Sequence, residues 1–147
     1  MKLSRTFTYA VQAVLELCRA PADQTMTCKE LAEQGGMPER FLLQILRSLV
    51  TKGLLASNRG VRGGYRLNRE AQEITMLDVL EAVEGAITFD LPPRQDGKQH
   101  RPEIGVLLGE ARDRIRRELA SIRICPGAQR DEDDDDGSTS SRLAAAG

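Results

Sequence analysis

Aromatic residues are scarce in this sequence: they make up 3% of its 147 residues, and tryptophan is absent. The core must therefore be built from leucine, isoleucine, valine and alanine, which favours helices packed on helices over a sandwich of aromatic-rich strands. No apolar run approaches the roughly 20 residues that cross a bilayer. The first residues also lack the long apolar stretch of a signal peptide. We therefore expect a cytoplasmic protein that makes no contact with a membrane.

Residues suited to catalysis or metal binding are also few. The chain has one histidine, His100, and three cysteines, Cys18, Cys28 and Cys125, whose wide spacing matches neither a CxxC pair nor a metal site. In a cytoplasmic chain these thiols are expected to be reduced. The glycine-rich stretch 60–64 lies in a predicted hairpin, whereas a phosphate-binding loop opens a helix. We expect a protein that is not an enzyme and that binds no metal.

Charge is unevenly distributed, although the formal net charge is only −1. Residues 1–69 hold 11 lysines and arginines against five acidic residues, whereas residues 70–147 hold 10 against 17. Within residues 40–69 there are seven basic residues and no acidic one. A basic face on an otherwise acidic molecule is typical of a protein that binds a polyanion, and a merely solvated positive surface is the alternative.

Hydrophobic periodicity predicts three helices in the first third of the chain. Thr27 is the expected N-cap of the second helix, with Glu30 as its capping-box partner. Gly35 and Gly36 supply the backbone freedom that a sharp turn requires after it. Two helices joined by a tight glycine-containing turn are typical of a helix-turn-helix unit. The predicted helices span residues 3–19, 29–34 and 38–52.

A hairpin and two further helices follow. Strand-like pieces at residues 54–57 and 65–67 flank a loop rich in glycine and arginine, which predicts a β-hairpin. Thr75, with Asp78 completing a capping box, begins a helix that ends at Gly85. After a stretch without a consistent period, a long helix with one apolar stripe is predicted from Pro102 to about Arg123.

Together these elements predict a mostly α fold with a small β-hairpin: a winged helix-turn-helix domain followed by a long C-terminal dimerisation helix. The acidic run Asp131–Asp136 lacks the spacing of a calcium-binding loop, and its surroundings have no means of burying a core. We divide the chain into a winged helix-turn-helix DNA-binding domain (1–85), a loop (86–101), the dimerisation helix (102–124) and a disordered acidic tail (125–147).

The helix-turn-helix unit supplies the candidate DNA contacts. Its second helix enters the major groove with its first residues facing the base edges, and the wing reaches an adjacent groove or the phosphates. Arg40 would bind guanine or a phosphate, and Gln44 would pair with adenine. Arg59 and Arg62 are cations on the wing, suited to a narrow minor groove. Each residue is also compatible with an ordinary solvated surface position, and Arg59, in its acid-free loop, is the one we favour.

Several segments resemble bacterial iron–sulfur-cluster regulators and nitric-oxide-sensitive repressors of the IscR, NsrR and CymR type. The resemblance covers residues 1–85 and, more weakly, the long helix. It implies a dimeric winged-helix regulator, expected to be a repressor, that binds a palindromic operator. It also implies DNA contacts at Arg40, Gln44 and Arg59, and a long helix that crosses its dimer mate. The segments are Tyr9–Val11, Leu31–Glu33, Phe41–Leu46, Leu49–Leu54, Arg59–Tyr65 and Val79–Gly85.

The sequence departs from the cluster-binding members of that family in one segment. Those members carry three closely spaced cysteines just before the dimerisation helix, in the region that receives the effector. Residues 86–101 contain no cysteine here and hold His100 as their one candidate ligand. Because thiolates are the usual cluster ligands, and one histidine does not replace three of them, we predict no iron–sulfur cluster and no other cofactor.

The signal that such a regulator would sense is left open by the sequence. Cys18 lies on the buried stripe of the first helix and is expected to act as a small hydrophobic residue. Cys28, at a helix N-terminus where the pKa of a thiol can fall, and Cys125, expected to be exposed, are the candidates for redox chemistry. For Cys28, a plain structural role is the alternative and the one that we favour. A small molecule bound near residues 86–101 and a protein partner are further options.

The alternative function is a winged-helix protein-interaction module that regulates, or is regulated by, a metabolic enzyme. The acid-free stretch 40–69 argues against a role confined to protein binding, because seven basic residues without a counter-charge are better suited to DNA.

Overall fold

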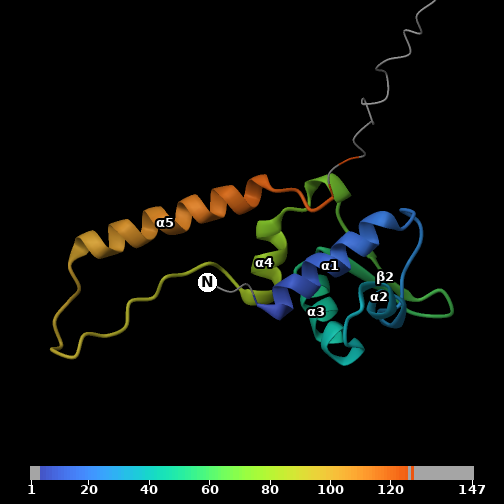
Figure 1. The fold of residues 1–147 in the computed structure, drawn as a ribbon, viewed down its shortest axis with the longest axis horizontal. Helices are drawn as coiled ribbons and strands as arrows, with labels where there is room; N and C mark the ends of the chain where they lie inside the picture. Colours follow the sequence, from blue (N-terminus) through green and yellow to red (C-terminus); the bar gives the residue numbers. More distant parts are fainter. Residues whose placement is uncertain (1–3, 126, 128–147) are drawn as a thin grey trace, which may run out of the picture.

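The computed structural model describes residues 4–125 and residue 127. It confirms the predicted fold class, a mostly helical chain with one two-stranded antiparallel hairpin and a long helix near its C-terminal end (Figure 1). None of the described helices is long and apolar enough to cross a membrane. The predicted tail, apart from Cys125 and Gly127, lies outside the described residues. The elements in chain order are α1 (Arg5–Arg19), α2 (Cys28–Gly35), α3 (Glu39–Thr51), β1 (Leu55–Asn58), β2 (Gly64–Leu67), the single 3₁₀ turn η1 (Ala71–Glu73), α4 (Met76–Glu84) and α5 (Pro102–Ser121).

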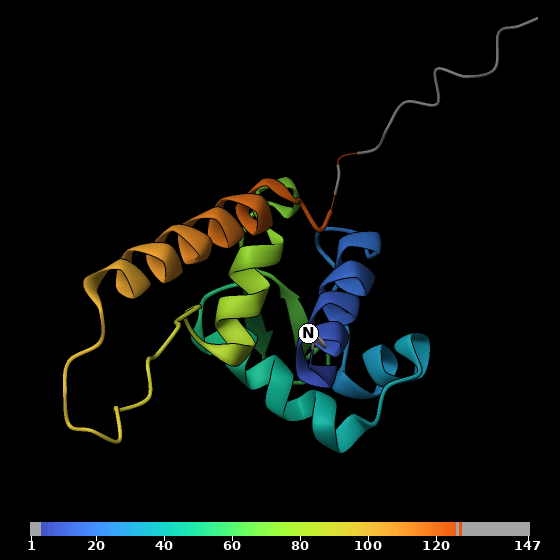
Figure 2. The ribbon, with the colours of Figure 1, turned by 60° about the vertical axis from the view of Figure 1, so that its left-hand side comes forward.

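The core lies between α1, α3 and α4. Helix α3 buries one face at the three- and four-residue spacing of an α-helix, and each of its buried leucine and isoleucine side chains contributes about 1.5–3 kcal/mol. Helix α4 packs against α1 and α3 on one side and contacts α5 on the other (Figure 2). Helix α5 therefore lies outside the core, and none of its own residues is buried. The buried residues of α3 are Leu42, Ile45, Leu46 and Leu49.

The capping boxes predicted for two helices are confirmed. The Thr27 backbone N–H donates to Glu30 Oε2 over 2.7 Å, and the Glu30 N–H donates to Thr27 Oγ1 over 3.2 Å. Thr75 and Asp78 make the same reciprocal pair at the start of α4. At the end of α2, Gly36 adopts a left-handed conformation (φ 60°), and the turn brings the Met37 N–H to the Ala32 carbonyl at 2.9 Å. This turn sets the direction in which α3 leaves α2.

The hairpin is attached to the helix-turn-helix unit by an isolated antiparallel β-bridge. Met26 and Tyr65 exchange two backbone hydrogen bonds, at 2.9 and 2.7 Å, so that the chain before α2 pairs with β2. A side chain at Gly64 would meet the Met26 backbone, since a Cβ built there lies 2.7 Å from the Met26 carbonyl oxygen. Gly64 also has a φ of +149°, which other residues rarely adopt. Glycine at this position therefore permits the wing to dock.

The chain after α5 differs from the sequence prediction. The long helix ends at Ser121 rather than near Arg123, because the following residues pair with the segment that leads into α4. The Met76 N–H donates to the Ile122 carbonyl at 2.9 Å, and the Ile124 N–H donates to the Ile74 carbonyl at 3.0 Å. The expectation that Cys125 is exposed is wrong: its side chain is 6% exposed and belongs to the core.

We expect Gly64→Ala to lower the free energy of unfolding by about 2–3 kcal/mol, because it adds a backbone collision to an unfavourable φ. Gly60→Ala is the matched control. That residue also has a positive φ, of 107°, but nothing lies within 4 Å of the position that a Cβ would take there. It should cost about 1 kcal/mol, the conformational penalty alone. Urea unfolding followed by circular dichroism measures both, and equal losses would show that the contact with Met26 does not constrain the wing.

Candidate nucleic-acid interface

The outer face of α3 carries the first group of candidate contacts. Arg40 and Gln44 lie in the first two turns of the helix, four residues apart, and Arg47 follows three residues later; all three are exposed. The spacing places them on one side of the helix. The opposite side holds the four buried apolar residues of α3. The structure thus presents the N-terminal half of α3 to solvent with a polar and basic surface.

The loop between β1 and β2 carries the second group. Asn58 pairs with Gly64 at the end of the ladder, and the Gly63 N–H donates to the Gly60 carbonyl at 2.9 Å to close the turn. Arg59 and Arg62 are both exposed on this loop, and the loop projects beside α2 (Figure 1). Thr25 Oγ1 donates to the Arg62 carbonyl at 3.0 Å, which fixes the base of the loop but leaves the guanidinium groups in solvent.

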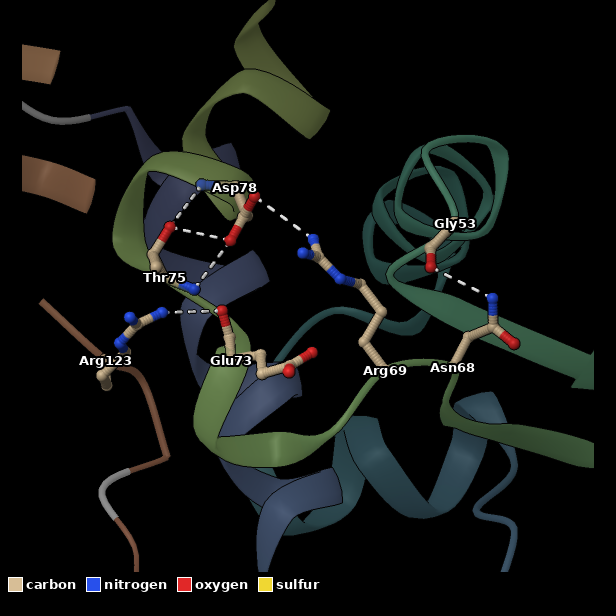
Figure 3. Close-up of polar contacts among 7 residues, drawn as sticks. All are labelled: Gly53, Asn68, Arg69, Glu73, Thr75, Asp78 and Arg123. Atoms are coloured by element: carbon tan, nitrogen blue, oxygen red, sulfur yellow. Dashed lines mark hydrogen bonds and ion pairs between the residues drawn. The ribbon is translucent and has the colours of Figure 1, made fainter. Parts of the chain in front are cut away.

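One of the seven basic residues of the 40–69 stretch, Arg69, has an acidic partner. Figure 3 shows Arg69 reaching from the end of the hairpin to Asp78 at the start of α4, with 3.3 Å between Nη1 and Oδ1. Partial burial raises the pKa of Asp78, but hydrogen bonds from Thr75 and the charge of Arg69 outweigh it and leave the pKa below its ordinary value. Beside it, Asn68 Nδ2 donates to the Gly53 carbonyl at 3.1 Å. Arg69 therefore stabilises the fold. The count of basic residues in the sequence could not separate it from those that are available to bind DNA.

The cysteines are placed differently from the sequence expectation. Burial, together with the nearby Glu39 carboxylate, raises the pKa of Cys28, which is opposite to the lowering that a helix N-terminus can produce. The Cys28 thiol donates to the Glu39 carbonyl at 3.7 Å. Cys18 and Cys125 form a disulfide, with their Cα atoms 6.1 Å apart and a sequence separation of 107. Cys125 is thus a paired residue, and Cys18 has a covalent role beyond that of a small hydrophobic residue.

The donor chemistry of the described residues does not fit an iron–sulfur cluster. Two of the three thiols bond to each other, and the third lies on α2. Across residues 4–125, no three histidine, cysteine or acidic side chains are grouped so as to hold a metal ion. His100, in the segment where relatives carry cluster ligands, lies with Nε2 2.7 Å from the Pro92 carbonyl oxygen.

The chain is similar in sequence and fold to known transcription regulators. The profile of the Rrf2 family, described as iron-dependent transcriptional regulators, matches residues 3–125. YffB of Lactococcus lactis, named as an HTH-type transcriptional regulator, is 32% identical over 132 residues, which are 84% of this chain and 85% of that protein. For two other relatives, from Mycobacterium tuberculosis, the chain spans only about half of their length (54%).

Solved structures agree with the sequence comparison. CymR of Bacillus subtilis, the global cysteine regulator of that organism, superposes with a TM-score of 0.67 at 26% identity, covering 84% of this chain and 93% of CymR. IscR of T. potens superposes with a TM-score of 0.65 at 29% identity, covering 84% and 83%.

We expect Cys28 to react slowly with iodoacetamide at pH 7, several-fold more slowly than in the urea-unfolded chain, because a raised pKa leaves less thiolate. Glu39→Gln should speed the reaction, but by less than unfolding does, since burial is the larger cause of the raised pKa. Glu33→Gln, which removes an exposed carboxylate on α2 itself, serves as the control. Labelling of the folded protein as fast as the unfolded chain would contradict the raised pKa.

Proposed function

This chain belongs to the Rrf2 family of transcriptional regulators, and from that premise we propose that it is a repressor that binds a palindromic operator as a homodimer. Binding to DNA follows from family membership; the dimer, the operator symmetry and the contact residues are our proposal. Promoter DNA lies in the cytoplasm of a bacterial cell, and we place the protein there.

The surface formed by the first turns of α3 and the hairpin loop carries the proposal. An α-helix fits the major groove, where Arg40 would bind guanine or phosphate and Gln44 would pair with adenine. The Met26–Tyr65 pairing holds the hairpin against the helix-turn-helix unit, so that Arg59 and Arg62 contact the adjacent groove or backbone from a fixed position. No acidic residue interrupts residues 40–69, which favours a polyanionic partner over a protein.

Helix α5 supports the homodimer. It runs for 20 residues, and in the single chain none of them is buried. Val106 and Leu107 are 61% and 65% exposed on this helix, and Ile122, just beyond it, is 48% exposed. Apolar side chains at this level of exposure favour burial against a second copy. Glu81 and Arg116 form an ion pair that holds α5 against α4, so each protomer would present its winged helix at a defined angle to the shared helix pair.

The family description as iron-dependent does not extend to an iron–sulfur cluster in this chain. Its thiols and its single histidine are not arranged as cluster ligands, as described above. We therefore propose a member of the family that responds to a signal other than cluster assembly.

We expect Arg59→Ala to weaken binding to a duplex carrying the protein's own promoter by about 10-fold, and to lower the slope of log affinity against log salt by about one, because one phosphate-neutralising cation is lost. Gln44→Ala should reduce the preference for that promoter over an unrelated duplex, since it removes a base contact. Fluorescence anisotropy at two salt concentrations measures both.

Arg112→Ala on α5 is the matched control, because it removes the same charge from an exposed arginine outside α3 and the hairpin. Equal binding by wild type and Arg59→Ala would contradict the wing contact. Weak, salt-insensitive binding to both duplexes would favour the alternative, a winged helix that binds a protein partner.

We expect Leu107→Asp to convert the protein from dimer to monomer in sedimentation velocity and to weaken operator binding by more than 10-fold, since a monomer engages one half-site. Arg112→Ala, at an exposed position of the same helix but away from the side that carries Val106 and Leu107, should leave both properties unchanged. A monomeric wild-type protein, or a Leu107→Asp variant that remains dimeric, would show that α5 does not form the interface.

A further inference from the structure

The end of α5 is joined to the DNA-binding domain by three kinds of contact. Residues 122–124 pair with residues 74–76 through two backbone hydrogen bonds, and Arg123 Nη1 donates to the Glu73 carbonyl at 3.0 Å (Figure 3). Ile124 is 5% exposed and packs in the core. The disulfide between Cys18 and Cys125 then ties this segment to α1. Among the described residues, it is the one covalent link, beyond the main chain, between the part after α5 and the winged helix.

The two sulfurs differ in their access to small reagents. Cys18 is half-buried and borders two surface cavities, of about 500 and 300 Å³. Cys125 is buried and borders the smaller cavity alone. A small disulfide can therefore approach Cys18 through both cavities, whereas Cys125 is more deeply buried and is reached through the smaller cavity alone. This difference favours Cys18 as the attacking cysteine and Cys125 as the resolving one.

The Cα separation of 6.1 Å lies within the range that ordinary disulfides span. A regulator that acts on DNA works in a reducing compartment, where disulfides are transient and act in sensing or catalysis rather than as permanent links.

We propose that Cys18 and Cys125 are a reversible thiol–disulfide pair that takes low-molecular-weight disulfides as oxidants, and that the oxidised pair clamps the end of α5 to α1 and tightens operator binding. The effect on DNA rests on the proposed function.

The exchange proceeds in two steps. The Cys18 thiolate attacks one sulfur of the small disulfide, whose S–S bond breaks and releases one small thiolate. The Cys125 thiolate then attacks Cys18 Sγ and expels the second. Two electrons pass from the protein thiols to the reagent, and the two protons end on the released thiols.

The clamp acts through the position of α5. In a dimer, the two recognition helices match two half-sites only if each winged helix is held at a fixed angle to the shared α5 pair. In the reduced protein, only backbone pairing, packing and the hydrogen bond from Arg123 to the Glu73 carbonyl hold residues 122–125. In this form the end of α5 is freer to move relative to the winged helix. Because that conformational freedom is lost when DNA binds, the reduced form binds DNA more weakly.

The test uses the full-length Cys28→Ala protein, so that the pair provides the only thiols, in glutathione buffers of varied ratio. After acid quenching and alkylation, mass spectrometry should find both cysteines modified or neither across the titration. Adding Cys125→Ala should trap one glutathione on Cys18, whereas Cys18→Ala should leave Cys125 unmodified. Backbone amides of residues 122–125 should exchange hydrogen faster after reduction.

Operator binding in the oxidised protein should be about fivefold tighter than in the reduced protein, at the lower end of common coupling strengths. Cys125→Ala should bind as the reduced protein does in both buffers. Failure of the pair to oxidise, or equal affinity and equal exchange in the two states, would overturn the proposal. If neither the oxidised nor the reduced protein binds DNA, that result counts against the proposed function instead. Mass spectrometry and hydrogen exchange then show by themselves whether the disulfide forms reversibly and holds the end of α5.

Discussion

The buried face of α3 is the constraint on which the DNA-facing surface depends. Leu42, Ile45, Leu46 and Leu49 are at most 2% exposed, so rotating the helix about its axis would expose several leucines at a cost of about 1.5–3 kcal/mol each. With that face fixed against the core, the direction of Arg40 and Gln44 is fixed as well. The proposed recognition surface is therefore oriented by apolar packing, and its polar residues can vary with the DNA sequence to be bound without changing that orientation.

Much of this arrangement could be predicted from the sequence because its signals are local. The capping boxes at Thr27 and Thr75 use partners three residues away, and the apolar spacing within α3 defines its buried face. The exposed positions of Arg59 and Arg62 follow from a loop rich in glycine between two strands. Each of these features is decided within about ten residues of the chain.

The features that sequence reasoning missed are the ones decided over long distances. Nothing near Cys125 in the chain indicates that it meets Cys18, 107 residues earlier, because the contact arises when residues 122–125 pair with the segment before α4. Arg69 could not be separated from the other basic residues of its stretch until Asp78 was placed beside it. For Cys28, the helix N-terminus is a local signal, but burial and the charge of Glu39, which belongs to the next helix, outweigh it.

These long-range contacts suggest how members of one family, with the same fold, can respond to different signals. In the cluster-binding relatives that this sequence resembles, the ligands precede the dimerisation helix and so act at its N-terminal end. Here that segment has no cysteine, and the covalent tie lies at the other end, after Ser121. In the proposed dimer, a constraint at either end of the 20-residue helix α5 would bias the same angle between the winged helix and the dimer interface. A chain without cluster ligands would then still be able to regulate DNA binding, provided that a bond at the other end of α5 is made and broken.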